Sequence, residues 1–225
     1  MASPIWLAVD TTDLAAARAL VADVAPYIGG VKLGLEFFVA HGPDGVRAVM
    51  ERQTLPLFLD LKLHDIPNTV AKAAAGSAAL RPAILTIHAG GGAAMIAAAR
   101  QAAHPDTRII AVTVLTSMDD SDLHDCGVDA GTAAQVARLA ALARRAGADG
   151  IVSSPHEVAA ARAAWPDGTL VVPGVRPAGA DHGDQKRVMT PAQAMAAGAS
   201  LLVIGRPVSA AANPAEAARA IAAGL

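Results

Sequence analysis

Short apolar segments recur along the whole chain, and nearly every one is followed by a segment typical of a helix. Several of the apolar segments are almost continuous in valine, isoleucine and leucine, as in strands that are buried on both faces. The intervening segments are rich in alanine, which favours helix. The predicted strands are Ile5–Asp10, Gly30–Leu35, Leu57–Leu63, Ala83–Ala89, Arg108–Thr116, Gly150–Ser153, Thr169–Val175 and Ser200–Arg206.

Residues at the ends of the intervening segments support the helices. Pro155, Pro191 and Pro207 fit a first helical turn. Gly147 and Gly198 fit the position just after a helix. The predicted helices are Leu14–Val24, Pro43–Gln53, Asn68–Leu80, Gly92–Ala103, Thr132–Ala146, Pro155–Trp165, Thr190–Ala197 and Pro207–Ala223.

A strand followed by a helix, eight times over, predicts an α/β protein with a (β/α)8 TIM-barrel fold. We expect residues 1–225 to form a single domain, because no shift in composition marks a boundary. The alternative is a doubly wound open sheet. The first strand-to-helix turn lacks the GxGxxG fingerprint found in many sheets of that kind, which favours the barrel.

The composition limits the partners of the protein. Hydrophobic residues make up 53% of the 225 residues and aromatic residues only 3%, so an aliphatic core is expected. A net charge of -2 argues against a general nucleic-acid or membrane-surface binder. No apolar segment suggests a signal peptide or a membrane span, and a cytoplasmic protein is expected.

The strand Leu57–Leu63 carries different residues on its two faces. Leucine occupies every second position, and the positions between carry Phe58, Asp60 and Lys62. Because residues two apart point the same way, the acid and the base lie on one face. Buried charges are costly unless they are paired, so this pattern predicts an ion pair at an opening that admits ligand. A structural ion pair on a sheet edge is the alternative.

Polar residues from unrelated segments fall at or near the carboxyl ends of the predicted strands. In a (β/α)8 barrel these ends meet at one face, where the active site lies. This convergence is the strongest argument from the residues for an enzyme. The residues are Asp10, Lys32, Asp60, Lys62, Thr116, Arg176 and Arg206.

A phosphate site is predicted after the seventh and eighth strands. Gly205 lets backbone N–H groups approach a ligand, and Arg206 adds a guanidinium fork suited to phosphate oxygens. The long segment 173–187 is rich in glycine and mixed charge, and Gln185 near its end could reach a ligand as part of a lid. For Gly205 and Arg206, the alternative is a plain turn with a solvated arginine. For the segment 173–187, the alternative is a surface loop that contacts no ligand.

No spacing of histidine, cysteine or acidic residues indicates a metal site. The acidic segment 116–131 resembles a solvated face more than a cation site. His88 ends the fourth strand and is interpreted as a packing histidine. A metal-free acid–base site centred on a lysine is the favoured interpretation.

Several motifs of the chain resemble those of a known family. Asp60-x-Lys62-x-x-Asp65-Ile66-Pro67-Asn68-Thr69 closely resembles the signature of the orotidine 5′-phosphate decarboxylase family. Similar matches run along the whole chain, with no departure at any matched position. They include Val31-Lys32, Ala111–Met118, Pro173–Arg176, Gly183–Gln185 and Ile204–Arg206.

The resemblance implies loss of CO2 from orotidine 5′-monophosphate to give UMP, in de novo pyrimidine biosynthesis, without metal or organic cofactor. Lys62 would donate a proton to C6 of the pyrimidine, and Asp60 would lie against the substrate carboxylate. Lys32 and Asp65 would complete an alternating network of bases and acids. A fixed ammonium group near C6 stabilises carbanion charge as it develops.

The resemblance also assigns binding roles. Asp65, Ile66 and Thr69 would reach into the site of the neighbouring subunit, so a homodimer with shared active sites is implied. The remaining roles are Asp10 and Lys32 for the ribose hydroxyls, Thr116 or Ser117 for the pyrimidine edge, and Arg176, Gln185, Gly205 and Arg206 for the phosphate or the lid.

Two alternative functions stay open from the sequence. The Asp-x-Lys-x-x-Asp core is shared with sugar-phosphate decarboxylases and synthases of the same superfamily, which would need Mg2+. A barrel that binds a phosphate ligand without turnover is the other alternative. The intact Asp60–Lys62 pair argues against it, because binding alone does not require a desolvated lysine beside a carboxylate.

Overall fold

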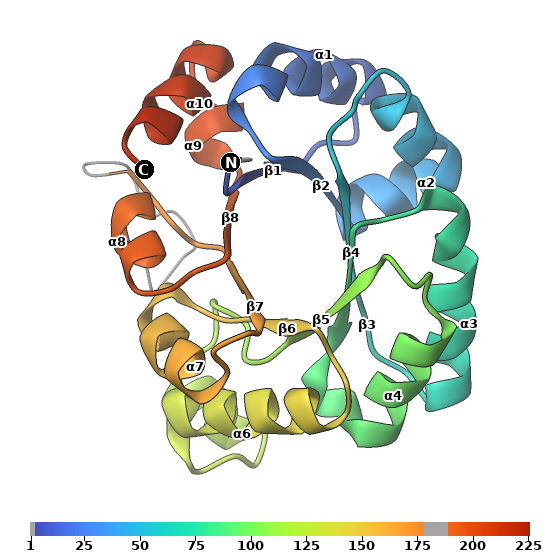
Figure 1. The fold of residues 1–225 in the computed structure, drawn as a ribbon, viewed down its shortest axis with the longest axis vertical. Coiled ribbons are helices and arrows are strands. Elements are labelled where there is room, and N and C mark those ends of the chain that lie inside the picture. The colour runs from blue at the N-terminus through green and yellow to red at the C-terminus, as the bar shows by residue number, and fades with distance from the viewer. Residues whose placement is uncertain (1–2, 178–188) are drawn as a thin grey trace.

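The computed structural model describes residues 3–177 and 189–225. Eight parallel strands pair in chain order, and the sheet closes because β1 pairs with β8 as well as with β2 (Figure 1). The predicted (β/α)8 barrel is therefore confirmed. The strands are β1 (Ile5–Val9), β2 (Gly30–Gly34), β3 (Leu57–Leu63), β4 (Ile84–His88), β5 (Arg108–Val112), β6 (Gly150–Val152), β7 (Thr169–Val172) and β8 (Leu201–Ile204).

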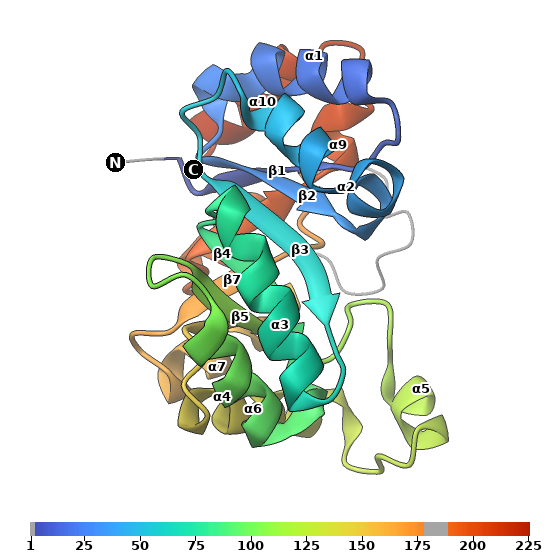
Figure 2. The same ribbon diagram turned by 90° about the vertical axis from the view of Figure 1, so that its right-hand side faces the viewer.

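Helices surround the barrel as an outer layer (Figure 1). Figure 2 shows α5 standing away from this layer, on the side to which the β3 arrow points. Within the described ranges, every helix is too short or too polar to cross a membrane. The α-helices are α1 (Leu14–Val24), α2 (Leu35–Met50), α3 (Pro67–Ser77), α4 (Gly92–Ala102), α5 (Asp120–Asp125), α6 (Gly131–Arg145), α7 (Val158–Ala164), α8 (Pro191–Ala196), α9 (Arg206–Ser209) and α10 (Pro214–Ala223). Short 3-10 helices are η1 (Ala25–Tyr27), η2 (Ala78–Leu80), η3 (Ala89–Gly91) and η4 (Pro155–Glu157).

The predicted helices Pro43–Gln53 and Pro207–Ala223 differ most from the helices of the structure. The helix predicted from Pro43 begins at Leu35, because a helical segment before Gly42 continues into the next one across a kink at that glycine, where φ is 59°. The helix predicted as a single segment after β8 is divided into α9 and α10. The division falls at Asn213, whose side chain accepts a hydrogen bond from the Glu216 N–H and so caps a new helix.

Most of the core lies in two largely aliphatic layers, and a small third cluster contains Val114, Leu123 and Val136. The larger layer lies between the strands and the helices, and the smaller layer fills the barrel interior. Trp6 and Phe58 meet edge to face inside the barrel, with ring centroids 6.0 Å apart. The next inward-facing side chain along β3 is Asp60. The apolar layer thus closes the bottom of the barrel, and polar side chains lie above it at the carboxyl ends of the strands.

Candidate active site

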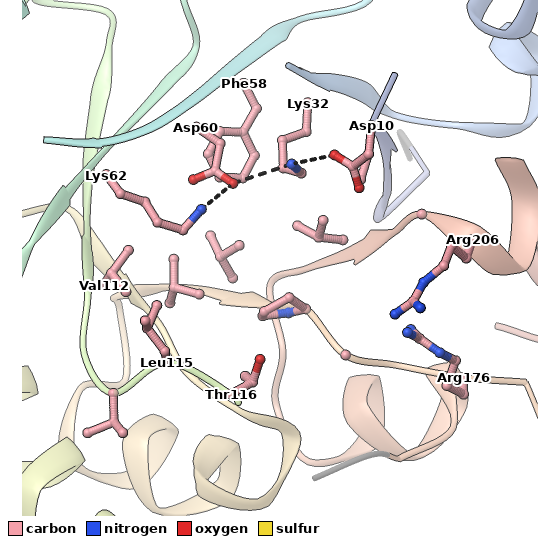
Figure 3. A pocket seen from close by; sticks show the side chains of 18 residues that line it. Asp10, Lys32, Phe58, Asp60, Lys62, Val112, Leu115, Thr116, Arg176 and Arg206 are labelled. Carbon is pink, nitrogen blue, oxygen red and sulfur yellow. Dashed lines mark hydrogen bonds and ion pairs between the residues drawn. The ribbon is translucent and has the colours of Figure 1, made fainter. Parts of the chain in front are cut away.

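A cavity of about 450 Å³ opens at the carboxyl ends of the strands (Figure 3). Eight of the site residues predicted from the sequence line it, although they come from separate segments of the chain. The convergence predicted from the ends of the strands is therefore present. These residues are Asp10, Lys32, Asp60, Lys62, Thr116, Arg176, Gly205 and Arg206.

Four of these side chains form a line of alternating charge along one wall. Lys32 Nζ lies 3.4 Å from Asp10 Oδ1 and 3.3 Å from Asp60 Oδ2, and Lys62 Nζ lies 2.8 Å from Asp60 Oδ2. The side chains of Lys32 and Asp60 are only 10% exposed, whereas that of Lys62 is 31% exposed. The predicted Asp60–Lys62 pair is present, and its lysine is the member that a ligand can reach.

The charge state of Asp60 follows from its surroundings. Burial alone would raise the pKa of the Asp60 carboxyl, but the ammonium groups of Lys32 and Lys62 oppose this. Hydrogen bonds from Lys62 and Thr86 act in the same direction as the lysines, so the pKa lies below its ordinary value. The pocket therefore holds a buried carboxylate that is ionised throughout the neutral range.

The strand β3 does not keep its regular alternation to the end. Leu57 and Leu59 are buried against the helices, but Leu61 and Leu63 are only partly buried. The β3–β4 ladder shifts register between Leu59 and Leu63, and Lys62 adopts a left-handed backbone with φ of 48°. The prediction of a uniform leucine face is correct for the first half of the strand only.

Thr86 is a site residue that the sequence pattern did not reveal. Its hydroxyl donates a hydrogen bond to Asp60 Oδ1 at 2.8 Å and accepts one from the Lys62 N–H at 2.9 Å. The side chain is fully buried. The sequence offers one signal for a role of Thr86: it is the only hydrogen-bonding side chain in the otherwise aliphatic segment Ile84–Ile87.

The opposite wall carries two arginines. In Figure 3 the guanidinium groups of Arg176 and Arg206 point toward each other, across the cavity from Lys62. Arg206 is the first residue of α9, and Gly205 precedes it at the N-cap. A Cβ at Gly205 would lie 3.4 Å from Asp10 Oδ2, in ordinary van der Waals contact, and the glycine leaves the backbone of this corner bare. Two guanidinium groups beside a bare backbone suit an oxyanion such as phosphate.

An apolar wall joins these two charged sides. Val112, Val114 and Leu115 line it together with Thr116. The strand β5 ends at Val112 rather than at the predicted Thr116, so Thr116 lies in the segment that leads to α5. Thr116 lines the cavity, whereas its predicted alternative Ser117 is not among the lining residues.

The remaining predicted site residues lie elsewhere. Asp65, Ile66 and Thr69 are exposed and do not line the cavity of their own chain. The Asp65 carboxylate accepts a hydrogen bond from the Ile66 N–H at 2.6 Å, and Ile66 is 66% exposed. Gln185 lies outside the described residues.

His88 stacks on His64 with ring centroids 5.3 Å apart. Burial lowers the pKa of His88, and the neighbouring His64 and Lys62 add to this effect. The neutral form of His88 is favoured, in line with its prediction as a packing residue.

Over residues 3–177 and 189–225, no cluster of three or more histidine, cysteine or acidic side chains could hold a metal ion.

The chain resembles one family along almost its whole length. A model of the Orotidine 5'-phosphate decarboxylase / HUMPS family matches residues 3–221. The chain is 59% identical to the orotidine 5'-phosphate decarboxylase of Sphingopyxis alaskensis and 56% identical to that of Novosphingobium aromaticivorans, with 100% of each chain covered. The crystal structure of orotidine 5'-phosphate decarboxylase from Lactobacillus acidophilus matches with a TM-score of 0.84 at 34% identity, over 97% of both chains.

Proposed function

The chain belongs to the orotidine 5′-phosphate decarboxylase / HUMPS family, and from this premise we propose how its pocket acts on its substrate. The protein decarboxylates orotidine 5′-monophosphate to UMP, a step of pyrimidine biosynthesis. The observation that carries the proposal is the buried Asp60 carboxylate, held between two lysines on the wall that faces two arginines. The test is direct: the purified protein should consume orotidine 5′-monophosphate and form UMP and CO2.

In the proposed reaction, the bond between C6 and the carboxylate carbon breaks and CO2 leaves. The electron pair of this bond stays on C6, where the Lys62 ammonium group stabilises it and then transfers a proton to it. Lys62 afterwards regains a proton from solvent. Asp60 lies against the substrate carboxylate, and its own carboxylate holds the Lys62 and Lys32 ammonium groups in place.

The other walls are proposed to orient the substrate. Arg176, Arg206 and the Gly205 backbone bind the phosphate, and Gln185 assists from the segment outside the described residues. Asp10 and Lys32 bind the ribose hydroxyls, and Thr116 meets the pyrimidine edge. Of the two acids in the charged line, Asp10 has the more exposed side chain, at 56% against 10% for Asp60, which suits contact with a ligand.

We also propose a homodimer with shared active sites, in the cytoplasm. Asp65, Ile66 and Thr69 are exposed beside the site but do not line it, which supports a role in the site of a partner. Ile66 and Leu115 are exposed large apolar side chains, at 66% and 38%, and such residues suit a subunit interface.

Mixing two inactive variants tests the shared site. If Asp65 serves the partner's site, Asp65→Ala mixed with Lys62→Ala forms mixed dimers in which one site has both residues intact. Full random exchange should restore about a quarter of the wild-type activity, since half of the dimers are mixed and half of their sites are intact. Activity is measured after mixing, with subunit exchange followed by mass spectrometry.

The matched control mixes Lys62→Ala with Asp60→Asn. These two residues belong to the same site of one chain, so no mixed dimer has an intact site and no recovery is expected. Absence of recovery with Asp65→Ala despite proven exchange would place Asp65 outside the partner's site.

A chelator separates this function from that of the Mg2+-dependent sugar-phosphate enzymes. We expect turnover of orotidine 5′-monophosphate to be undiminished in EDTA, because the proposed chemistry uses an ammonium group where those enzymes use a metal ion. Turnover is followed by the loss of orotidine 5′-monophosphate absorbance. Loss of activity in EDTA that Mg2+ restores would contradict the metal-free mechanism.

A further inference from the structure

A single buried hydroxyl joins the two residues to which the proposed function gives the chemistry. Thr86 lies in the middle of β4, and its side chain is fully buried. The Lys62 N–H can only donate a hydrogen bond, so the Thr86 oxygen accepts at 2.9 Å. The hydroxyl proton is then free for Asp60 Oδ1, 2.8 Å away, which as a carboxylate oxygen can only accept. The direction of both bonds is therefore fixed.

The first of these bonds lies where the β3–β4 ladder is irregular. Leu59 pairs with Leu85 and Leu63 pairs with Ile87, so β3 advances further than β4 between the two pairs. The extra length is accommodated where Lys62 turns into the left-handed region with φ of 48°. Such a conformation is unfavourable for a residue other than glycine and persists only where the surroundings hold it. The Thr86 side chain supplies the acceptor that holds the Lys62 N–H there.

The second bond fixes the carboxylate of Asp60. Lys62 Nζ and Lys32 Nζ both lie against Oδ2, at 2.8 and 3.3 Å. Without Thr86, the plane of the carboxylate could rotate about this single atom. The hydrogen bond to Oδ1 ties the other oxygen to β4, so both ends of the carboxylate are held.

We infer that Thr86 is a positioning residue of the decarboxylation: its hydroxyl fixes the Lys62 backbone and the Asp60 carboxylate relative to each other. This inference rests on the roles of Lys62 and Asp60 in the proposed function. Thr86 is not among the residues that line the cavity, so it acts through these two residues and not on the substrate. Correct placement of reacting groups is a large part of catalysis, and small displacements slow the reaction strongly.

Removal of the hydroxyl tests the inference. Thr86→Val and Thr86→Ala both remove the hydroxyl. The valine keeps the branched shape of the side chain, whereas the alanine packs differently. Both should lower the single-turnover rate of decarboxylation by about 10- to 100-fold, the effect expected for one lost hydrogen bond to a charged group. The affinity for UMP, measured by calorimetry, should change little because the phosphate and ribose contacts are intact. Thr86→Ser keeps the hydroxyl and should restore most of the rate.

A buried threonine at the other end of the barrel gives the matched control. Thr107 is 2% exposed, and its hydroxyl donates to the Pro82 carbonyl at 2.6 Å. Thr107→Val loses a comparable buried hydrogen bond and should keep the wild-type rate in the folded protein. The comparison separates loss of a hydroxyl near the reacting groups from loss of a buried hydroxyl in general.

Several outcomes would overturn the inference. A folded Thr86→Val or Thr86→Ala enzyme with the wild-type rate would do so, as would a Thr86→Ser enzyme as slow as Thr86→Val. If only Thr86→Ser folds, the role of the hydroxyl is structural and the inference fails. Lys62→Ala serves as the reference: if it stays active, the proposed function itself fails, whatever the Thr86 variants do.

Discussion

Replacement of Lys62 by alanine should abolish decarboxylation while the barrel stays folded. The variant loses the proposed proton donor and the ammonium group that stabilises charge at C6. General acids contribute up to about 10⁴-fold to rates, and the lost electrostatic stabilisation adds to this, so a loss of about 10⁴-fold or more is expected. The barrel should survive because Lys32 still lies 3.3 Å from the Asp60 carboxylate. Turnover and thermal unfolding are the two measurements.

Two further variants make the result specific to Lys62. Lys72 is an exposed lysine on α3, and Lys72→Ala should leave the rate unchanged. Lys62→Arg keeps a positive charge beside Asp60 but replaces the proton donor with a group that does not release its proton, so it should stay inactive. Full activity of Lys62→Ala would remove Lys62 from the mechanism.

Replacement of Arg206 by alanine should lower kcat/KM for orotidine 5′-monophosphate by roughly 10²-fold, the cost of a lost charge-assisted contact. In the proposed pose, Arg206 holds the phosphate across the cavity from Lys62. Binding of a group that does not react can offset the cost of ordering the site and desolvating the reacting carboxylate. On orotidine, which lacks the phosphate, the same variant should change little because the contact is already missing.

The comparison of both enzymes on both substrates is the deciding measurement. Gln185→Ala should act in the same direction as Arg206→Ala with a smaller effect. Arg138→Ala, which removes an exposed arginine of α6, is the control and should be neutral on both substrates. An Arg206→Ala enzyme that is slowed equally on both substrates would show that Arg206 is not the phosphate contact.

The fold could be predicted because its information is local. Strands buried on both faces require apolar segments such as Ile5–Asp10, and the helices between them have their own propensity and end signals. The carboxyl ends of barrel strands meet at one face, and this rule predicted that Asp10, Asp60 and Arg206 lie together. They do line one cavity, although nothing in their spacing along the chain indicates it.

What the sequence did not predict depends on tertiary contacts or on polar local structure. The role of Thr86 depends on the register of β3 against β4, and the shift in that register has no local signature. The short helix α5 has no apolar repeat. It is held by the reciprocal capping hydrogen bonds of Asp119 and Asp122 and by the burial of Leu123, and its acidic composition resembled that of a solvated segment.

The pairing of β1 with β8 has a consequence for the order in which the protein can assemble. Every other pairing in the barrel joins strands that are neighbours along the chain, so it can form as the chain emerges. The pairing of Ile5 with Leu202 must wait for the last strand and is the slowest kind of contact to make. Asp10 and Arg206 stand at the two sides of this seam. The pocket is therefore completed by the same late event that closes the barrel, and a nascent chain that stops short of β8 has neither.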